Sequence, residues 1–152
     1  PGTAASFITC LIYYILWLAE FSLHNHKIYL VCFLIIILIY SISLIDKLSQ
    51  FFKKKDPKEI VIDEFFCQCI PLVAFLFRPE NLSHLGSRTN NYILIYILLS
   101  FILFRFFDIL KPYPINIVDK KMKNGVGIML DDIIASIYSI ILLSVIFFFL
   151  GA

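Results

Sequence analysis

Charged side chains are scarce in this chain of 152 residues: Asp, Glu, Lys and Arg together make up 16% of it, against roughly 25% in ordinary globular domains. Hydrophobic residues make up 61%, and 16 of the residues are phenylalanine. This scarcity of charge excludes a water-soluble domain, and no nucleic-acid partner is expected. The composition predicts an integral membrane protein, with residues 1–152 forming a single domain.

Cysteine and histidine are also few, which limits the possible chemistry. The four cysteines (Cys10, Cys32, Cys67 and Cys69) lie in apolar stretches, and the spacing of the last two does not fit a zinc site. We expect packed, reduced thiols. No cysteine is followed six positions later by arginine, which excludes a phosphocysteine mechanism. The motifs of haloacid-dehalogenase and lipid phosphate phosphatases are absent as well.

Long apolar stretches dominate what is present. Five such segments occur, at residues 6–23, 28–45, 65–77, 92–107 and 133–150. A membrane-spanning helix needs about 20 residues, so the third segment is short, and because it contains Pro71 it is predicted to be kinked, tilted or only partly inserted. The pattern predicts an all-α membrane bundle with about four to five membrane segments.

Basic residues predict how this bundle is oriented. If all five segments cross, the N-terminus, residues 46–64 and residues 108–132 share one side. With Arg105 assigned to the adjacent loop, that side carries ten of the thirteen Lys and Arg residues. The positive-inside rule makes that side cytoplasmic. The three histidines fall on the other side. The basic run Lys53–Lys55 is interpreted as a membrane-surface anchor.

Two acidic pairs stand at the cytoplasmic starts of membrane segments: Asp63 with Glu64, and Asp131 with Asp132. One interpretation is structural, because carboxylates are favourable at helix N-termini. However, like charges beside an apolar region are costly unless a cation neutralises them. Mg²⁺ prefers oxygen ligands, so the two pairs predict a magnesium site.

The stretch FRFFDILKPYPINIVD at residues 104–119 carries most of the remaining polar groups. Arg105 and Asp108 are three residues apart and share a helix face. Arg105, Lys111 and Lys120 can donate to a phosphate, whereas Asp108 and Asp119 can bind metal or act as a base. The alternative is that Arg105 and Asp108 form only a structural ion pair.

Two further features concern the backbone. Pro112 and Pro114 predict an extended path over residues 110–115, with Lys111 at a rigid corner. Residues 124–127, Asn-Gly-Val-Gly, are predicted to turn the chain into the last helix. At the start of the chain, Gly2 and Thr3 precede a helix, where backbone amides can bind a phosphate, although Pro-Gly-Thr is also an ordinary helix start.

Taken together, PGTAAS, VIDEF, the 104–119 stretch and NGVGIMLDDIIA resemble the phosphatidylglycerophosphatase A family in order and approximate spacing. The resemblance implies a small, Mg²⁺-dependent bacterial membrane phosphatase that converts phosphatidylglycerophosphate to phosphatidylglycerol and phosphate. It also implies an inner-membrane enzyme whose substrate lies in the bilayer. The positions that match the family elements are Gly2, Thr3, Asp63, Glu64, Arg105, Asp108, Lys111, Asp119, Gly127, Asp131 and Asp132.

Within this resemblance, Asp63, Glu64, Asp131 and Asp132 are expected to hold Mg²⁺. Catalytic roles are expected for Arg105, Asp108, Lys111 and Asp119, and phosphate binding for Gly2, Thr3, Arg105 and Lys111. Whether water or an aspartate attacks phosphorus stays open.

This chain also departs from the family pattern. Ala5, Cys67 and Asn124 replace glycines usual in the family, and the glycine-rich lead-in before Pro1 is expected to be missing.

Two other functions compete with this prediction. A CDP-alcohol phosphotransferase also uses membrane aspartates, but its Asp-Gly-x-x-Ala-Arg block is absent. A small cation-transporter subunit would use the same carboxylates as ion ligands, although transport favours acids at mid-membrane. A lipid phosphatase remains the preferred interpretation.

Overall fold

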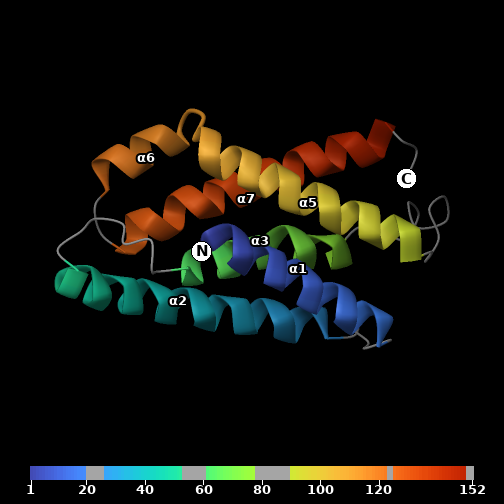
Figure 1. The fold of residues 1–152 in the computed structure, drawn as a ribbon, viewed down its shortest axis with the longest axis horizontal. Helices are drawn as coiled ribbons and strands as arrows, with labels where there is room; N and C mark the ends of the chain where they lie inside the picture. Colours follow the sequence, from blue (N-terminus) through green and yellow to red (C-terminus); the bar gives the residue numbers. More distant parts are fainter. Residues whose placement is uncertain (20–25, 53–60, 78–89, 123–124, 150–152) are drawn as a thin grey trace.

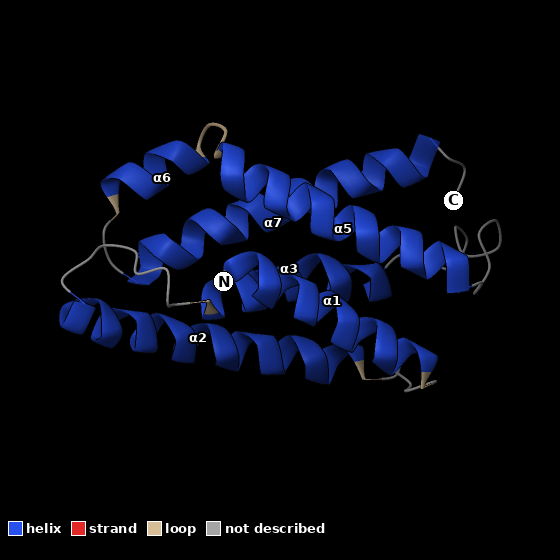
Figure 2. Cartoon of the chain, viewed as in Figure 1, coloured by secondary structure: helices blue, strands red, loops and turns tan. Residues whose placement is uncertain are grey.

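The computed structural model describes residues 1–19, 26–52, 61–77, 90–122 and 125–149 (Figure 1). Its elements are helices α1 (Gly2–Leu18), α2 (Lys27–Phe52) and α3 (Ile62–Ala74), the 3-10 turn η1 (Phe75–Phe77), and helices α5 (Asn90–Leu110), α6 (Ile115–Lys121) and α7 (Gly125–Phe149). No strand occurs among these residues (Figure 2). The predicted all-α fold is confirmed.

Three of the described helices are long and apolar enough to cross a membrane: they contain the stretches Lys27–Lys47, Asn91–Leu110 and Gly125–Phe149. Helix α1 is apolar but shorter. Helix α3 has 13 residues, so at 1.5 Å per residue it is only about 20 Å long, well short of the roughly 30 Å hydrocarbon core. The prediction of a short third segment containing Pro71 is confirmed, and whether it crosses stays a prediction.

The short helix α3 is the centre of the bundle, because it packs against α1, α2, α5 and α7. Buried polar groups join it to its neighbours: the Ser136 hydroxyl on α7 donates to the carbonyl oxygen of Cys67 over 2.8 Å, and the Gln68 amide donates to the Ser100 hydroxyl on α5 over 3.1 Å. Small hydroxyl residues allow close helix packing in membranes and hydrogen-bond across the interface. These bonds fix α3 between α5 and α7.

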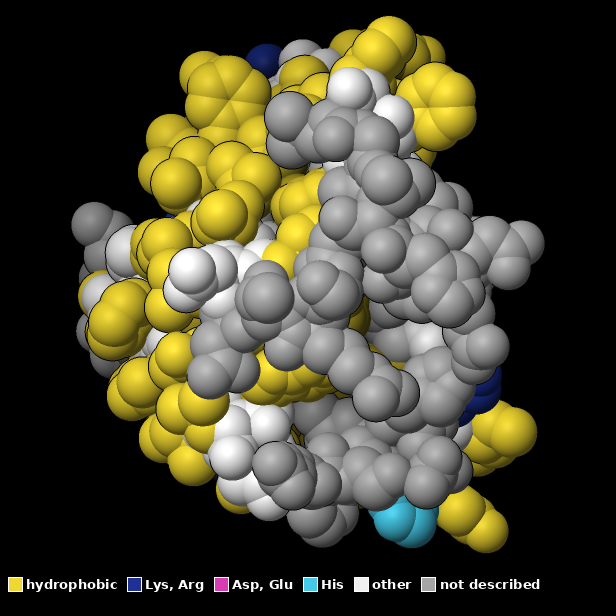
Figure 3. Space-filling view, turned by 90° about the vertical axis from the view of Figure 1, so that its right-hand side faces the viewer, with side chains coloured by type: hydrophobic (Ala, Val, Ile, Leu, Met, Phe, Trp, Pro, Cys, Tyr) yellow, Lys and Arg dark blue, Asp and Glu magenta, His cyan; other side chains and the backbone are white. Residues whose placement is uncertain are grey.

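Several helix ends meet at one end of the bundle. The starts of α1, α3 and α7, the end of α5 and all of α6 lie toward the left of Figure 1. At the opposite end, the visible described side chains are mostly hydrophobic, with some basic ones and no acidic one among them (Figure 3). His26 directly precedes α2, at that opposite end, and His24 and His84 fall outside the described residues. The acidic residues that line the cavity described below therefore lie at the end predicted to be cytoplasmic, among the part of the chain that the structure describes.

Some predicted boundaries were wrong. The last helix begins at Gly125 rather than near residue 133, so residues 125–127 are helical and only Asn124 of the predicted turn lies outside the described residues. The stretch 110–115 is not extended: Leu110 ends α5, Lys111 has a φ of 43°, residues 112–114 form a turn, and Ile115 begins α6. The first helix starts at Gly2, and its predicted end at residue 23 also lies outside the described residues.

All four cysteines are free, as predicted. Cys10 and Cys67 are buried and Cys69 is partly buried. Cys32 is exposed on α2, so the prediction that it is packed was wrong. Cys32 lies in an apolar stretch because α2 is an apolar helix long enough to cross a membrane, and not because its thiol is packed inside the bundle.

Candidate active site

A cavity of about 330 Å³ lies where the helix ends meet. Helices α1, α3, α5, α6 and α7 all contribute to its walls. The residues expected to bind metal, bind phosphate or act in catalysis all line it: Gly2, Thr3, Asp63, Glu64, Arg105, Asp108, Lys111, Asp119, Asp131 and Asp132. The structure therefore brings these residues together in one place, and their individual roles stay predictions.

The first acidic pair lies in the first turn of α3, as the sequence indicated. Asp63 is buried, with 6% of its surface exposed, and its Oδ1 accepts a hydrogen bond of 3.0 Å from the backbone N–H of Glu64. This contact and the helix dipole stabilise a carboxylate here. The position of the pair therefore agrees with the structural interpretation, in which carboxylates stabilise a helix N-terminus. Both side chains also line the cavity.

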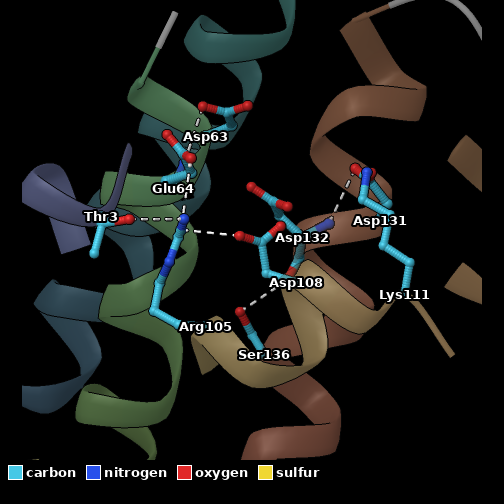
Figure 4. A network of polar contacts seen from close by, with 9 residues as sticks. All are labelled: Thr3, Asp63, Glu64, Arg105, Asp108, Lys111, Asp131, Asp132 and Ser136. Atoms are coloured by element: carbon cyan, nitrogen blue, oxygen red, sulfur yellow. Dashed lines mark hydrogen bonds and ion pairs between the residues drawn. The ribbon is translucent and has the colours of Figure 1, made fainter. Parts of the chain in front are cut away.

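Arg105 links three of the surrounding helices (Figure 4). Its Nη1 lies 2.9 Å from Oδ2 of Asp108 and 3.5 Å from Oε1 of Glu64, and its Nη2 donates to the Thr3 hydroxyl over 3.3 Å. The predicted pairing of Arg105 with Asp108 on one helix face is confirmed. Nε is buried without a hydrogen-bond partner, and Nη1 is ion-paired but not aligned for a hydrogen bond. The guanidinium therefore retains donor capacity beside the cavity.

Lys111 occupies the end of α5 at a corner of the chain. Its backbone N–H still donates to Phe107, and its ammonium lies 2.7 Å from Oδ2 of Asp131 and 3.1 Å from Oδ1 of Asp119. Burial alone lowers the pKa of the Lys111 ammonium, but hydrogen bonds to Asp131 and Asp119 and their charges outweigh burial, so the net pKa is raised. Lys111 therefore stays protonated at neutral pH.

The second acidic pair lies deeper than the sequence indicated. Asp131 and Asp132 are the seventh and eighth residues of α7, about two turns from its start, and each is only 5% exposed. Asp131 faces Lys111, whereas Asp132 lies toward Asp108 (Figure 4). The interpretation of this pair as residues at the helix start was wrong, because α7 begins at Gly125 and Asp131 is only its seventh residue.

Contacts far apart in sequence set this deeper position. The backbone N–H of Gly125, the first residue of α7, donates to the carboxylate of Asp46 on α2. A Cβ on Gly127 would overlap the carbonyl oxygen of Met122. Asp46 was not predicted as a cap of α7, and no local signal points to it because 79 residues separate the partners.

Six carboxylates and two basic side chains line the cavity, so negative charge is in excess. Within the part of the chain that the structure describes, no three His, Cys, Asp or Glu side chains already stand together as a metal site. The basic groups explain this, because Lys111 lies against Asp131 and Arg105 lies between Glu64 and Asp108. An all-oxygen donor set with uncompensated charge fits Mg²⁺.

Other residues of the cavity wall were not predicted from sequence as site residues: Pro1, Met122 and Ile128. Conversely, Lys120 is one of the three basic residues that the sequence offered as possible phosphate donors, but it is exposed on α6 and is not part of the wall. Lys120 directly follows the site residue Asp119 on α6, and adjacent residues of a helix face different directions, so sequence proximity alone does not identify which of the two lines the cavity.

Comparison with known proteins identifies the class. Residues 1–147 match the phosphatidylglycerophosphatase A family. A phosphatidylglycerophosphatase A of Haemophilus influenzae is 61% identical over 46 residues, which cover 30% of this chain and 28% of that protein. One of Escherichia coli K12 is 28% identical over 140 residues, 91% of this chain and 69% of that protein.

A third relative carries a different name. A putative phosphatidylinositol-3-phosphatase of Bacteroides thetaiotaomicron is 31% identical over 148 residues, which cover 95% of this chain and 82% of that protein. No solved structure matches the chain.

The match to residues 1–147 and the names of these relatives place the chain in a class of helical membrane phosphatases acting on lipids. It belongs to the phosphatidylglycerophosphatase A family. The resemblance drawn from the motifs is confirmed, and so is the expectation of an enzyme.

Proposed function

We propose that this protein hydrolyses phosphatidylglycerophosphate to phosphatidylglycerol and phosphate, in a Mg²⁺-dependent reaction at the cytoplasmic face of a bacterial inner membrane. The observation that carries this proposal is the meeting of two basic side chains and six carboxylates around one cavity at the end of an apolar bundle. The family supports the substrate, and the ten basic residues predicted on that side support the cytoplasmic face.

In the reaction, the terminal phosphate enters the cavity while the lipid chains stay in the bilayer. Arg105 and Lys111 are the donors for its oxygens, because both the guanidinium and the ammonium group line the cavity and stabilise charge developing on the phosphoryl group. Thr3 and Gly2, at the start of α1, border the same space and would contact the phosphate from the α1 side.

The carboxylates have two proposed tasks. Asp63, Glu64, Asp131 and Asp132 would hold Mg²⁺, which supplies Lewis-acid polarisation of the phosphoryl oxygens when bound. Asp108 lies 2.9 Å from Arg105 and lines the cavity, so it is placed either to accept a proton from the attacking water or to attack phosphorus itself. Trapping of a phosphoenzyme after acid quench would support attack by Asp108.

A second substrate is worth a direct comparison, because the Bacteroides thetaiotaomicron relative aligns with almost the whole chain and is named as a putative phosphatidylinositol-3-phosphatase. Both lipids carry a phosphomonoester. They differ in whether the phosphate is attached to a short glycerol or to a bulky inositol ring. The 330 Å³ cavity, about the lower limit for ligand pockets, favours the smaller head group.

The test is phosphate release by the purified protein in detergent micelles that contain one or the other lipid, with Mg²⁺ present. We expect a higher kcat/KM for phosphatidylglycerophosphate than for phosphatidylinositol 3-phosphate. The reverse order would reassign the substrate within the phosphatases. Absence of release from both lipids, together with cation uptake by proteoliposomes, would favour a transporter subunit instead.

A further inference from the structure

The backbone at Lys111 adopts a conformation that ordinary residues avoid. Its φ of 43° lies in the left-handed region, and Lys111 is the only described non-glycine residue with a positive φ. At the end of a helix this conformation is usually taken by glycine or asparagine, because a Cβ is unfavourable there. A lysine at this point therefore needs another explanation, and its side chain offers one.

The Lys111 ammonium bridges two carboxylates that lie at different depths. The side chain of Asp131 is 7% exposed and the ammonium lies 2.7 Å from it, whereas the side chain of Asp119 is 40% exposed and lies 3.1 Å away. The inner carboxylate comes from α7 and the outer one from α6. One cation thus connects the interior of the cavity with its outer part.

Burial makes the inner contact the more demanding of the two. A buried carboxylate without a counter-charge is strongly unfavourable, so Asp131 needs a cation, which is Lys111 when no metal is bound. An ammonium and a divalent cation compete for the same oxygens. If the divalent cation binds Asp131, Lys111 must find another acceptor, and Asp119 is already within reach.

We propose that Asp119 is a positioning residue for Lys111 and not a metal ligand. In the metal-free protein, Lys111 neutralises Asp131. When a divalent cation binds Asp131, Asp119 alone retains the ammonium, which turns its other N–H groups toward the substrate phosphate. The identity of the cation rests on the proposed function, but the coupling between Lys111 and Asp119 is a separate claim.

Binding of Mn²⁺, used as a spectroscopic substitute for Mg²⁺, tests the coupling in the full chain in detergent micelles. Electron paramagnetic resonance of free Mn²⁺ gives its Kd for the wild type, Lys111→Met, Asp119→Asn and the double variant. We expect Lys111→Met to bind at least about tenfold more tightly, because a competing charge is removed from Asp131. Asp119→Asn should bind at least about threefold more weakly, because Lys111 is then confined to Asp131.

The double variant decides between the two roles of Asp119. If Asp119 acts only through Lys111, its replacement has no effect on Kd in the Lys111→Met background. Equal weakening in both backgrounds would make Asp119 a ligand and overturn the proposal, as would unchanged or weaker binding by Lys111→Met. The control is Lys120→Met, which removes the same charge from an exposed position on α6 and should change Kd less than about twofold.

Different results would contradict the proposed function and the positioning role of Asp119. If neither the wild type nor Lys111→Met binds Mn²⁺, and phosphate release from phosphatidylglycerophosphate does not depend on Mg²⁺, the metal assignment itself is wrong. If Mn²⁺ binds the wild type and supports phosphate release while the double variant shows no coupling, only the positioning role of Asp119 is wrong.

Discussion

Gly2 lies directly against the carboxylate of Glu64: a Cβ on Gly2 would overlap both carboxylate oxygens of that side chain. The first turn of α1 and the first turn of α3 meet at this point, on the wall of the cavity. Glu64 also lies 3.5 Å from Arg105. A side chain at position 2 would therefore displace a carboxylate that contacts the proposed phosphate-binding arginine.

Gly2→Ala should consequently lower activity more than stability. The Glu64 side chain can rotate away from a methyl group, so the fold is retained, but its carboxylate then leaves its place beside Arg105. Misplacement of about 1 Å at a reacting centre can cost roughly 10²-fold in rate, and we expect kcat to fall at least about tenfold. Phosphate-release kinetics and the apparent Tm in detergent check this together. An unchanged kcat would show that activity does not depend on the position of the Glu64 carboxylate beside Arg105.

Gly127→Ala should lower stability more than activity. The atoms that a Cβ would meet there include backbone atoms, which cannot rotate away as a side chain can. A Cβ on Gly127 would overlap the carbonyl oxygen of Met122 and lie 2.8 Å from its carbonyl carbon. The chain before α7 must shift, which typically costs about 1–3 kcal/mol. Thermal unfolding in detergent should show a lower apparent Tm than for Ser144→Ala, a change at an exposed position of the same helix. Equal Tm values for the two variants would contradict this packing argument.

Lysines at the same end of the bundle should differ sharply in their effects. Removal of a donor aimed at transition-state charge typically costs on the order of 10²–10³ in rate, so Lys111→Ala should lower kcat by roughly that factor. Lys120 and Lys121 are exposed on α6, and their joint replacement by alanine should change mainly apparent affinity for lipid, in a salt-dependent way. The comparison requires steady-state kinetics at two salt concentrations. If kcat fell in the variant that lacks Lys120 and Lys121 but not in Lys111→Ala, the assignment of the phosphate donor to Lys111 would be wrong.

The orientation prediction can be tested by cysteine labelling. In a background where the four native cysteines are replaced by alanine, a cysteine at position 121 should react with a membrane-impermeant reagent only from the cytoplasm, and one at position 26 only from outside. Lys121 ends α6 and His26 precedes α2, at opposite ends of the bundle. Labelling of both from the same side would contradict the proposed topology.

Much of the site could be predicted from sequence because its elements are local. The spacing of Arg105 and Asp108 places both on one helix face, and the structure shows them 2.9 Å apart. Asp63 and Glu64 precede an apolar run and lie in the first turn of α3. Such patterns need no information about distant parts of the chain.

Other features depend on partners far away and could not be predicted. The start of α7 at Gly125 relies on a hydrogen bond to Asp46, which no local pattern reveals, so Asp131 and Asp132 were placed too near the helix start. Residues before proline favour extended conformations, yet Lys111 is left-handed at the end of α5. Its contacts with Asp131 and Asp119 involve two other helices, and tertiary interactions override the local preference there.

The central claim is that buried carboxylates at the end of this bundle form a Mg²⁺-dependent phosphatase site. It is tested most directly by phosphate release from phosphatidylglycerophosphate by the wild type, Asp131→Asn and Asp132→Asn, measured across a range of Mg²⁺ concentrations, with membrane insertion verified for each. We predict release by the wild type only when Mg²⁺ is present and loss of that release in both variants. Wild-type release in the presence of EDTA, or near-normal turnover of both variants at low Mg²⁺, would contradict this claim.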